Sequence, residues 1–161
     1  RFIMKIAFGV DPGGFCLREG VLAHLKEKGH EVLDLGTQDM DNPIPYMIVG
    51  RNVAEAVTSG KADFGVVMCG TGMGISIATN KIKGARCAMV ESYYAARESR
   101  IINDANIIAL GGTTTSLRMA CEMIDVFLET KWGQGLPDFR VQRIKDGAKK
   151  LAEYEDEQFG K

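Results

Sequence analysis

A cysteine followed by a glycine-rich loop is the part of this sequence best suited to chemistry. The stretch FGVVMCGTGMGIS, residues 64–76, begins as an apolar run, reaches Cys69 and passes through three glycines before it becomes apolar again. Glycines allow a backbone to approach a ligand closely, and a helix that starts after such a loop offers free N–H groups to an anion. A thiolate would be stabilised near the same donors. The pattern predicts a site for a small anion with Cys69 as its reactive group.

Asp11 supplies a second polar group at the end of another apolar run. It follows MKIAFGV, residues 4–10, and precedes a Pro-Gly-Gly break. In parallel α/β sheets ligands bind beyond the carboxyl ends of the strands, so we expect Asp11 and Cys69 to share one edge. A buried cysteine or a tight glycine turn alone has a purely structural explanation, but their combination favours function. Dinucleotide binding is disfavoured, because GTGMG lacks the G-x-G-x-x-G spacing.

The elements that must position these residues alternate along the chain. Short apolar runs predict five strands, at residues 4–10, 30–36, 63–69, 85–90 and 106–112. Apolar residues at helical spacing predict helices near 17–25, 46–57 and 117–128, the first two stopped by Gly29 and Gly60. Continuous apolar strands separated by helices indicate a parallel sheet covered on both faces. We therefore expect a three-layer α/β/α Rossmann-like domain with a mainly parallel five-stranded sheet.

Composition limits the classes of partner. The chain has 161 residues, enough for one domain, and its net charge of −1 disfavours nucleic acid and membrane surfaces as partners. No apolar run approaches the roughly 20 residues of a membrane span, and no signal-peptide core is present, so we expect a cytoplasmic protein. The four cysteines lack C-x-x-C spacing, which disfavours zinc and disulfide frameworks and indicates reduced thiols. They are Cys16, Cys69, Cys87 and Cys121.

The C-terminal segment carries a narrow apolar seam on an otherwise charged stretch. The seam consists of Val141, Ile144, Ala148 and Leu151. It predicts a helical arm that packs either on its own domain or on a second subunit, and the pattern favours neither. We expect the main domain to cover residues 4–145 and a helical extension with an acidic tail to cover 146–161.

Three stretches resemble the ribose-5-phosphate isomerase B family, which includes the galactose-6-phosphate isomerase subunits. They are MKIAFGVDPGGFCLRE, GKADFGVVMCGTGMGISIATNKIKGARCAMV and SRIINDANIIALGG. The similarity spans residues 4–145, and the combination of C-G-T-G-x-G, G-x-R and N-D-A-N is specific. The resemblance implies an aldose–ketose isomerase of a small sugar phosphate, a pentose or tetrose, that needs no metal or other cofactor. It also implies a homodimer or dimer of dimers whose sites are each built from two chains.

The resemblance assigns roles to particular residues. Cys69 is expected to move a proton between C1 and C2 of the sugar, and Thr71 to assist by holding a substrate hydroxyl. The loop and Asn103 are expected to bind the enediolate oxygens, which agrees with the general need for a base and for donors to the developing charge. The residues expected to bind substrate are Asp11, Pro12, Gly70, Gly72, Met73, Gly74, Asn103 and Arg140.

The chain departs from the family mostly in its basic residues. Family histidines are replaced by Pro12, Glu91 and Ile102, and family arginines by Thr113 and Leu136. Two interpretations remain open. In the first, the substrate needs no ring opening, as with a four-carbon sugar phosphorylated on its terminal oxygen. In the second, the substrate has no phosphate, or its phosphate is bound elsewhere, and the remaining cations are Arg86, Arg97, Arg100 and Arg140.

Glu91 is the residue that could replace the missing acid. An exposed glutamate is ionised at neutral pH and is a poor acid, so only burial would suit Glu91 to that role. An alternative function is that of a non-catalytic or partner subunit of a hetero-oligomeric isomerase, or of a sugar-phosphate-binding protein. Retention of Cys69 favours an enzyme. Redox regulation through Cys69 would need a resolving cysteine nearby, and none is visible in the sequence.

Overall fold

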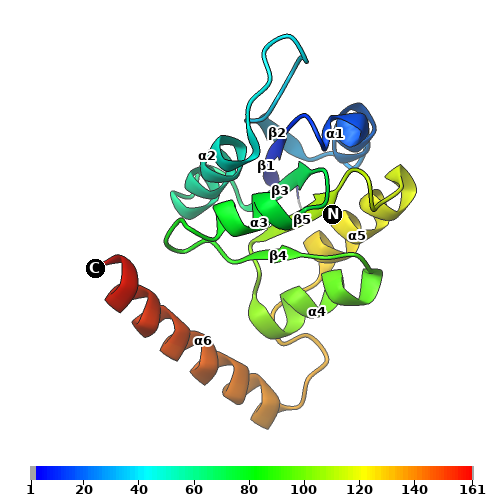
Figure 1. The fold of residues 1–161 in the computed structure, drawn as a ribbon. Coiled ribbons are helices and arrows are strands. Elements are labelled where there is room, and N and C mark those ends of the chain that lie inside the picture. Colours follow the sequence, from blue (N-terminus) through cyan, green and yellow to red (C-terminus); the bar gives the residue numbers. More distant parts are fainter. Residues whose placement is uncertain (1–2, 161) are drawn as a thin grey trace.

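The computed structural model describes residues 3–160 as one parallel sheet between two layers of helices (Figure 1). The strands are β1 (Lys5–Val10), β2 (Glu31–Asp34), β3 (Phe64–Cys69), β4 (Cys87–Met89) and β5 (Ile107–Gly111). They lie in the order β2-β1-β3-β5-β4, and every neighbouring pair is parallel. The predicted fold class is confirmed, with each strand within two residues of its expected bounds.

The helices divide between the two faces of the sheet. They are the short 3₁₀ helix η1 (Phe15–Leu17), α1 (Arg18–Glu27), α2 (Tyr46–Thr58), α3 (Met73–Thr79), α4 (Tyr93–Asn103) and α5 (Leu117–Glu129). Helices α1, α4 and α5 pack with side chains such as Phe8 and Met68 on one face. Helices α2 and α3 pack with Ala7 and Val67 on the other. Because successive strand residues point to opposite faces, each central strand supplies both cores.

Burial explains why the sequence forms these strands. β5 is buried along its whole length, and β1 and β3 are buried at all but their first residue. The edge strands β2 and β4 are only partly buried. The predicted helix stops are confirmed at Gly29, with φ +87°, and Gly60, with φ +76°, since glycine adopts this left-handed region without a Cβ penalty.

The last helix, α6 (Asp138–Phe159), leaves the domain as a long arm (Figure 1). None of its residues is buried, although its far end contacts the turn after α3. There Lys83 forms an ion pair with Asp156 (2.7 Å), and the Gly84 N–H donates to Glu155 Oε1 (2.8 Å). The predicted helical arm is confirmed, and it runs without a break through residue 145, where we expect the main domain to end. Within residues 3–160, no helix is long and apolar enough to cross a membrane.

Candidate active site

Three turns meet at the carboxyl edge of the sheet, where the central strands end. The Asp11 N–H donates to the Met68 carbonyl (3.0 Å), and the Gly112 N–H donates to the Cys69 carbonyl (2.8 Å). A Cβ atom at Gly13 would lie 2.5 Å from the backbone nitrogen of Gly70. The turns after β1, β3 and β5 are therefore in direct contact, and Asp11 and Cys69 lie at the same edge.

Cys69 lies at the base of the glycine loop. Its side chain is buried, and its Sγ accepts a hydrogen bond from the Gly72 N–H at 3.2 Å. Gly72 has φ +77°, and a Cβ there would lie 3.0 Å from the carbonyl carbon of Leu110. Only glycine fits this conformation without strain, and the conformation is what directs an N–H donor at the sulfur. One backbone N–H donor therefore points at the sulfur from the loop.

The rest of the loop is fixed from the β5 side. The Gly70 carbonyl accepts hydrogen bonds from Thr113 Oγ1 (2.6 Å) and from the Thr113 N–H (2.9 Å). Thr71 is exposed, and its Oγ1 accepts from the Met73 N–H (3.3 Å). Met73 is half exposed, and Gly74 faces the ring of Tyr46, with a Cβ position 3.4 Å away. The loop is thus held in place while its outer residues face solvent.

Asp11, Pro12 and Glu91 surround this loop at the same edge. The Asp11 carboxylate accepts from the Gly14 N–H (3.1 Å), and Pro12 is exposed beside it. Glu91 follows β4 by two residues and is exposed; the Met89 side chain near it lies 3.2 Å from the Cβ position of Gly72. The exposure of Glu91 disfavours it as a replacement acid.

Asn103 and Arg140 lie elsewhere. Asn103 ends α4, and β5 begins four residues later, so Asn103 lies at the amino edge of the sheet, opposite Cys69. The segment that leads to α6 starts at the same edge, where the Gly133 N–H donates to the Ile101 carbonyl (2.9 Å). Arg140 is exposed in the first turn of α6. One chain therefore does not bring Asn103 or Arg140 to Cys69.

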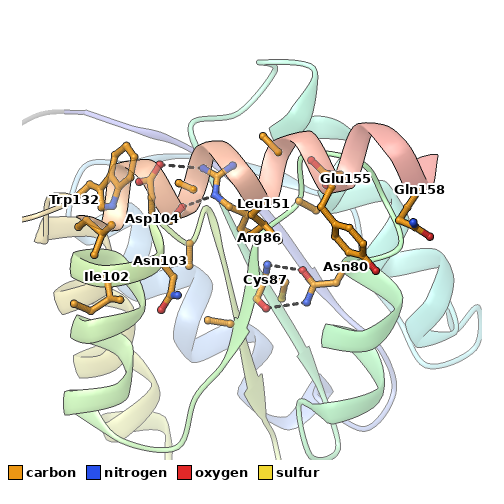
Figure 2. Close-up of a pocket in the computed structure, with 18 of the residues that line it drawn as sticks. Asn80, Arg86, Cys87, Ile102, Asn103, Asp104, Trp132, Leu151, Glu155 and Gln158 are labelled. Atoms are coloured by element: carbon orange, nitrogen blue, oxygen red, sulfur yellow. Dashed lines mark hydrogen bonds and ion pairs between the residues drawn. The ribbon is translucent and has the colours of Figure 1, made fainter. Parts of the chain in front are cut away.

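A large groove separates α6 from the domain at this amino edge (Figure 2). Its volume is about 790 Å³, and Asn103, Trp132 and Leu151 contribute to its walls. Most of its lining is apolar, and the Trp132 indole N–H has no hydrogen-bond partner within residues 3–160. Burial raises the pKa of Cys87, also in the groove, to about 12, so this thiol stays neutral.

Three of the four candidate arginines form ion pairs within the chain. Arg100 is buried between the rings of Phe64 (4.7 Å) and Phe127 (5.5 Å) and pairs with Asp104 (2.8 Å). Arg86 also pairs with Asp104 (3.1 Å), and Arg97 pairs with Glu98 (2.7 Å). Arg140 forms no ion pair with any other described residue. No group of three His, Cys, Asp or Glu side chains in the described part of the chain could hold a metal ion.

Sequence reasoning missed the role of two glycines and of Thr113. A Cβ at Gly112 would lie 2.5 Å from the Gly13 carbonyl oxygen, so the first and third turns need glycine to approach each other. Glycine pairs close to the ends of two apolar runs, Gly13-Gly14 and Gly111-Gly112, were a visible signal of such an approach. Nothing in the sequence indicated the hydrogen bond from Thr113 to the loop.

Comparison with known proteins identifies the family to which the chain belongs. The family model for ribose/galactose isomerases matches residues 6–144. The chain belongs to this family. It is therefore an isomerase, as the sequence predicted, and its fold agrees with that of solved family members. Ribose-5-phosphate isomerase B of Clostridium thermocellum superposes with a TM-score of 0.87 at 41% identity, over 96% of this chain and 99% of that one.

Three curated family members differ in what they act on. The chain is 39% identical to 4-deoxy-4-sulfo-D-erythrose isomerase of Clostridium sp. (strain MSTE9), over 95% of this chain and 96% of that protein. It is 41% identical to galactose-6-phosphate isomerase subunit LacB of Clostridium acetobutylicum, over 98% of this chain and 88% of that protein. It is also 41% identical to ribose-5-phosphate isomerase B of Escherichia coli, over 87% of this chain and 93% of that protein. Similarity at this level establishes the family and leaves the substrate to be argued from the site.

Proposed function

We propose that this protein interconverts an aldose and a ketose of four carbons that carry an anionic group on C4. Cys69 is the base, and no metal ion takes part. The observation that carries the proposal is the buried Cys69 Sγ under the glycine loop, with the Gly72 N–H aimed at it from 3.2 Å. The same loop offers the donors that an enediolate needs.

The proposed reaction consists of three proton transfers. The Cys69 thiolate takes the proton from C2 of the aldose, and the electrons of the broken C–H bond form the C1–C2 double bond of an enediolate. The negative charge on O1 is stabilised by loop N–H groups and by Asn103. The O2 hydroxyl proton passes to O1, and the Cys69 thiol returns its proton to C1. The product is the ketose, and the thiolate is restored.

The four-carbon chain follows from the absence of a ring-opening group. The chain has two histidines. His24 Nε2 bonds to Asp125 (2.7 Å), between α1 and α5, and His30 Nδ1 accepts from the Met4 N–H (3.3 Å) at the start of β1. Neither lies at the Cys69 edge. A tetrose with phosphate or sulfonate on C4 lacks the free hydroxyl that would close a five-membered ring, so it needs no such group. The relative named as a sulfoerythrose isomerase supports this choice.

We expect D-erythrose 4-phosphate or its sulfonate analogue to turn over with a kcat/KM about tenfold or more above that of ribose 5-phosphate. The reason is that ribose 5-phosphate is mostly cyclic. Proton NMR in deuterated water would follow both the isomerisation and the exchange at C1 and C2. Faster turnover of ribose 5-phosphate than of every tetrose would contradict the open-chain substrate.

Glu91→Gln provides the matched test of the same prediction. If no ring is opened, no acid is needed at this exposed position, and the tetrose kcat should change by less than about threefold. A severe loss would instead assign the acid role to Glu91.

We also propose that the active enzyme is a homodimer in which a second copy supplies Asn103 and Arg140 to each Cys69. Asn103 and Arg140 are exposed at the opposite edge of the sheet from Cys69, and α6 projects from the domain with an apolar groove beside it. The unpartnered Trp132 indole N–H in that groove supports a protein surface as its occupant.

Mixed dimers test the shared site. Cys69→Ala and Asn103→Ala homodimers should each be inactive, since both sites of each are damaged. Unfolding and refolding the two variants together should produce mixed dimers with one intact site and one doubly damaged site. A statistical mixture should recover about a quarter of the wild-type activity. No recovery, with mixed dimers verified by mass spectrometry, would contradict the sharing of Asn103.

A role as partner subunit is the second candidate. The LacB relative, named as a subunit, favours it. A purified chain that is inactive on all tetrose, pentose and hexose phosphates, and active once an unlike family member is added, would select this candidate over the homodimer.

A further inference from the structure

The turns at the carboxyl edge of the sheet contain no positively charged side chain. They comprise residues 11–16, 35–45, 70–72, 90–92 and 112–116. None of these residues is Lys, Arg or His, whereas Asp11, Asp39, Asp41 and Glu91 are acidic. These turns therefore offer carboxylates and no cation to an anionic ligand beside Cys69.

Arg18, the first basic residue after the β1 turn, does not change this balance. Its guanidinium pairs with Asp34 and Glu19, and its Nε donates to the Thr37 carbonyl (3.1 Å). The Arg18 side chain is 12% exposed. Its charge is balanced by these two carboxylates, and Arg118, the first basic residue after the β5 turn, pairs with Glu122 (2.9 Å).

Neutral side chains take the place of cations around the loop. Thr113 and Thr114 are exposed on the turn after β5, and Thr113 is bonded to the Gly70 carbonyl next to Cys69. On the proposed homodimer, Arg140 of the second copy is the arginine that we expect at this edge. A single cation balances one negative charge, whereas a second negative charge on the ligand adds repulsion from Asp11 and Glu91.

We infer that the site selects a terminal group with one negative charge, a sulfonate, over a phosphate dianion, and that Thr113 sets this choice. The inference rests on the proposed function. A sulfonate carries a single charge at every pH of interest, and its three oxygens can accept from hydroxyl and N–H donors. A phosphate matches that charge only in its monoanionic form.

The test is the ratio of kcat/KM for 4-deoxy-4-sulfo-D-erythrose to that for D-erythrose 4-phosphate, measured from pH 5 to pH 8. The second ionisation of a phosphate monoester has a pKa of about 6, so the phosphate substrate is mostly a monoanion at pH 5 and a dianion at pH 8. The titratable and charged groups on the turns at this edge are Asp11, Asp39, Asp41, Cys69 and Glu91, the helices that follow add Arg18 and Arg118, and we expect Arg140 from the second copy. Their ionisation in the free enzyme is common to both substrates, so it cancels in the ratio.

We expect the sulfonate to be preferred by about tenfold or more at pH 8, and the preference to shrink by about tenfold or more at pH 5. A preference for the phosphate at pH 8, or a ratio that does not change with pH, would overturn the inference alone. Failure of both substrates to turn over at any pH would overturn the proposed function and the inference with it.

Variants in the turn after β5 test whether this turn determines the preference for sulfonate over phosphate. Thr113→Arg should lower the sulfonate-to-phosphate ratio at pH 8 by about tenfold, the effect of one cation beside the terminal group. Thr113→Val removes the hydroxyl without adding charge, and Ala23→Arg adds the same charge to the exposed side of α1; both should keep the ratio. If Thr113→Arg misfolds by circular dichroism, Thr114→Arg tests the neighbouring position. An unchanged ratio in a folded arginine variant would overturn the role of this turn.

Discussion

Cys69→Ala should lower kcat on the tetrose substrate by about 10²–10⁴-fold, the range of contribution of a positioned general base. The sulfur lies at the end of β3, under the loop. Cys16 is at the same edge, but it is exposed and its Sγ donates to the Gly112 carbonyl (3.5 Å), whereas Cys87 lies in the groove at the far edge. The fold should persist, because an alanine leaves the strand and the loop backbone unchanged. Substrate binding by calorimetry should therefore survive while turnover is lost.

Cys121→Ala is the matched control. Burial, followed by the nearby Asp125, raises the pKa of the Cys121 thiol, which lies on α5 away from the loop. Its removal should leave kcat unchanged. Exchange at C1 and C2 in deuterated water gives a direct readout of the base, and persistence of fast exchange in Cys69→Ala would reject the assignment.

Gly72→Ala should lower kcat by about 10²-fold or more, the typical cost of removing one aligned oxyanion donor. Its φ of +77° strains any residue with a Cβ, and that Cβ would meet the Leu110 carbonyl carbon at 3.0 Å. The loop must shift to relieve the contact. The N–H that points at Cys69 Sγ then moves, together with the donors that we assign to the enediolate.

Gly60→Ala separates the backbone strain from the effect on the site. Gly60 has nearly the same φ, +76°, and nothing lies within 4 Å of its Cβ position. Both variants should lose about 1–2 kcal/mol of stability from the left-handed conformation alone, as thermal unfolding would measure. Gly60→Ala should keep wild-type kcat. Equal losses of activity in the two variants would show that stability, not loop geometry, explains the effect.

The strands could be predicted from the sequence because their burial requires continuous apolar runs. β3 and β5 are continuous apolar runs in the sequence and are buried in the structure, and Gly29 and Gly60 end helices where expected. Helix α4 had no sequence prediction of its own, since its first turn exposes Tyr93 and Tyr94. Ser92, whose side chain caps the Ala95 N–H (3.1 Å), was the signal that could have marked its start.

The candidate site was predictable only where it is local in the sequence. Cys69 and its loop are consecutive residues, and Asp11 ends a neighbouring strand, so strand order alone brings them together. Asn103 comes before a strand and not after it, which places it at the other edge of a parallel sheet. The separation of Asn103 from Cys69 thus follows from chain order, whereas the burial of Arg100 between two rings depends on tertiary packing and has no local signature.

The position of Cys69 and Asn103 at opposite edges of one sheet has an evolutionary consequence for the proposed homodimer. Each chain lends its two edges to two different reaction centres. After a gene duplication, loss of the carboxyl edge in one copy and of the amino edge in the other would damage the same centre of their heterodimer and spare the second centre. The two genes could then drift apart, each relieved of selection on one edge, while the pair that they encode retains one competent centre.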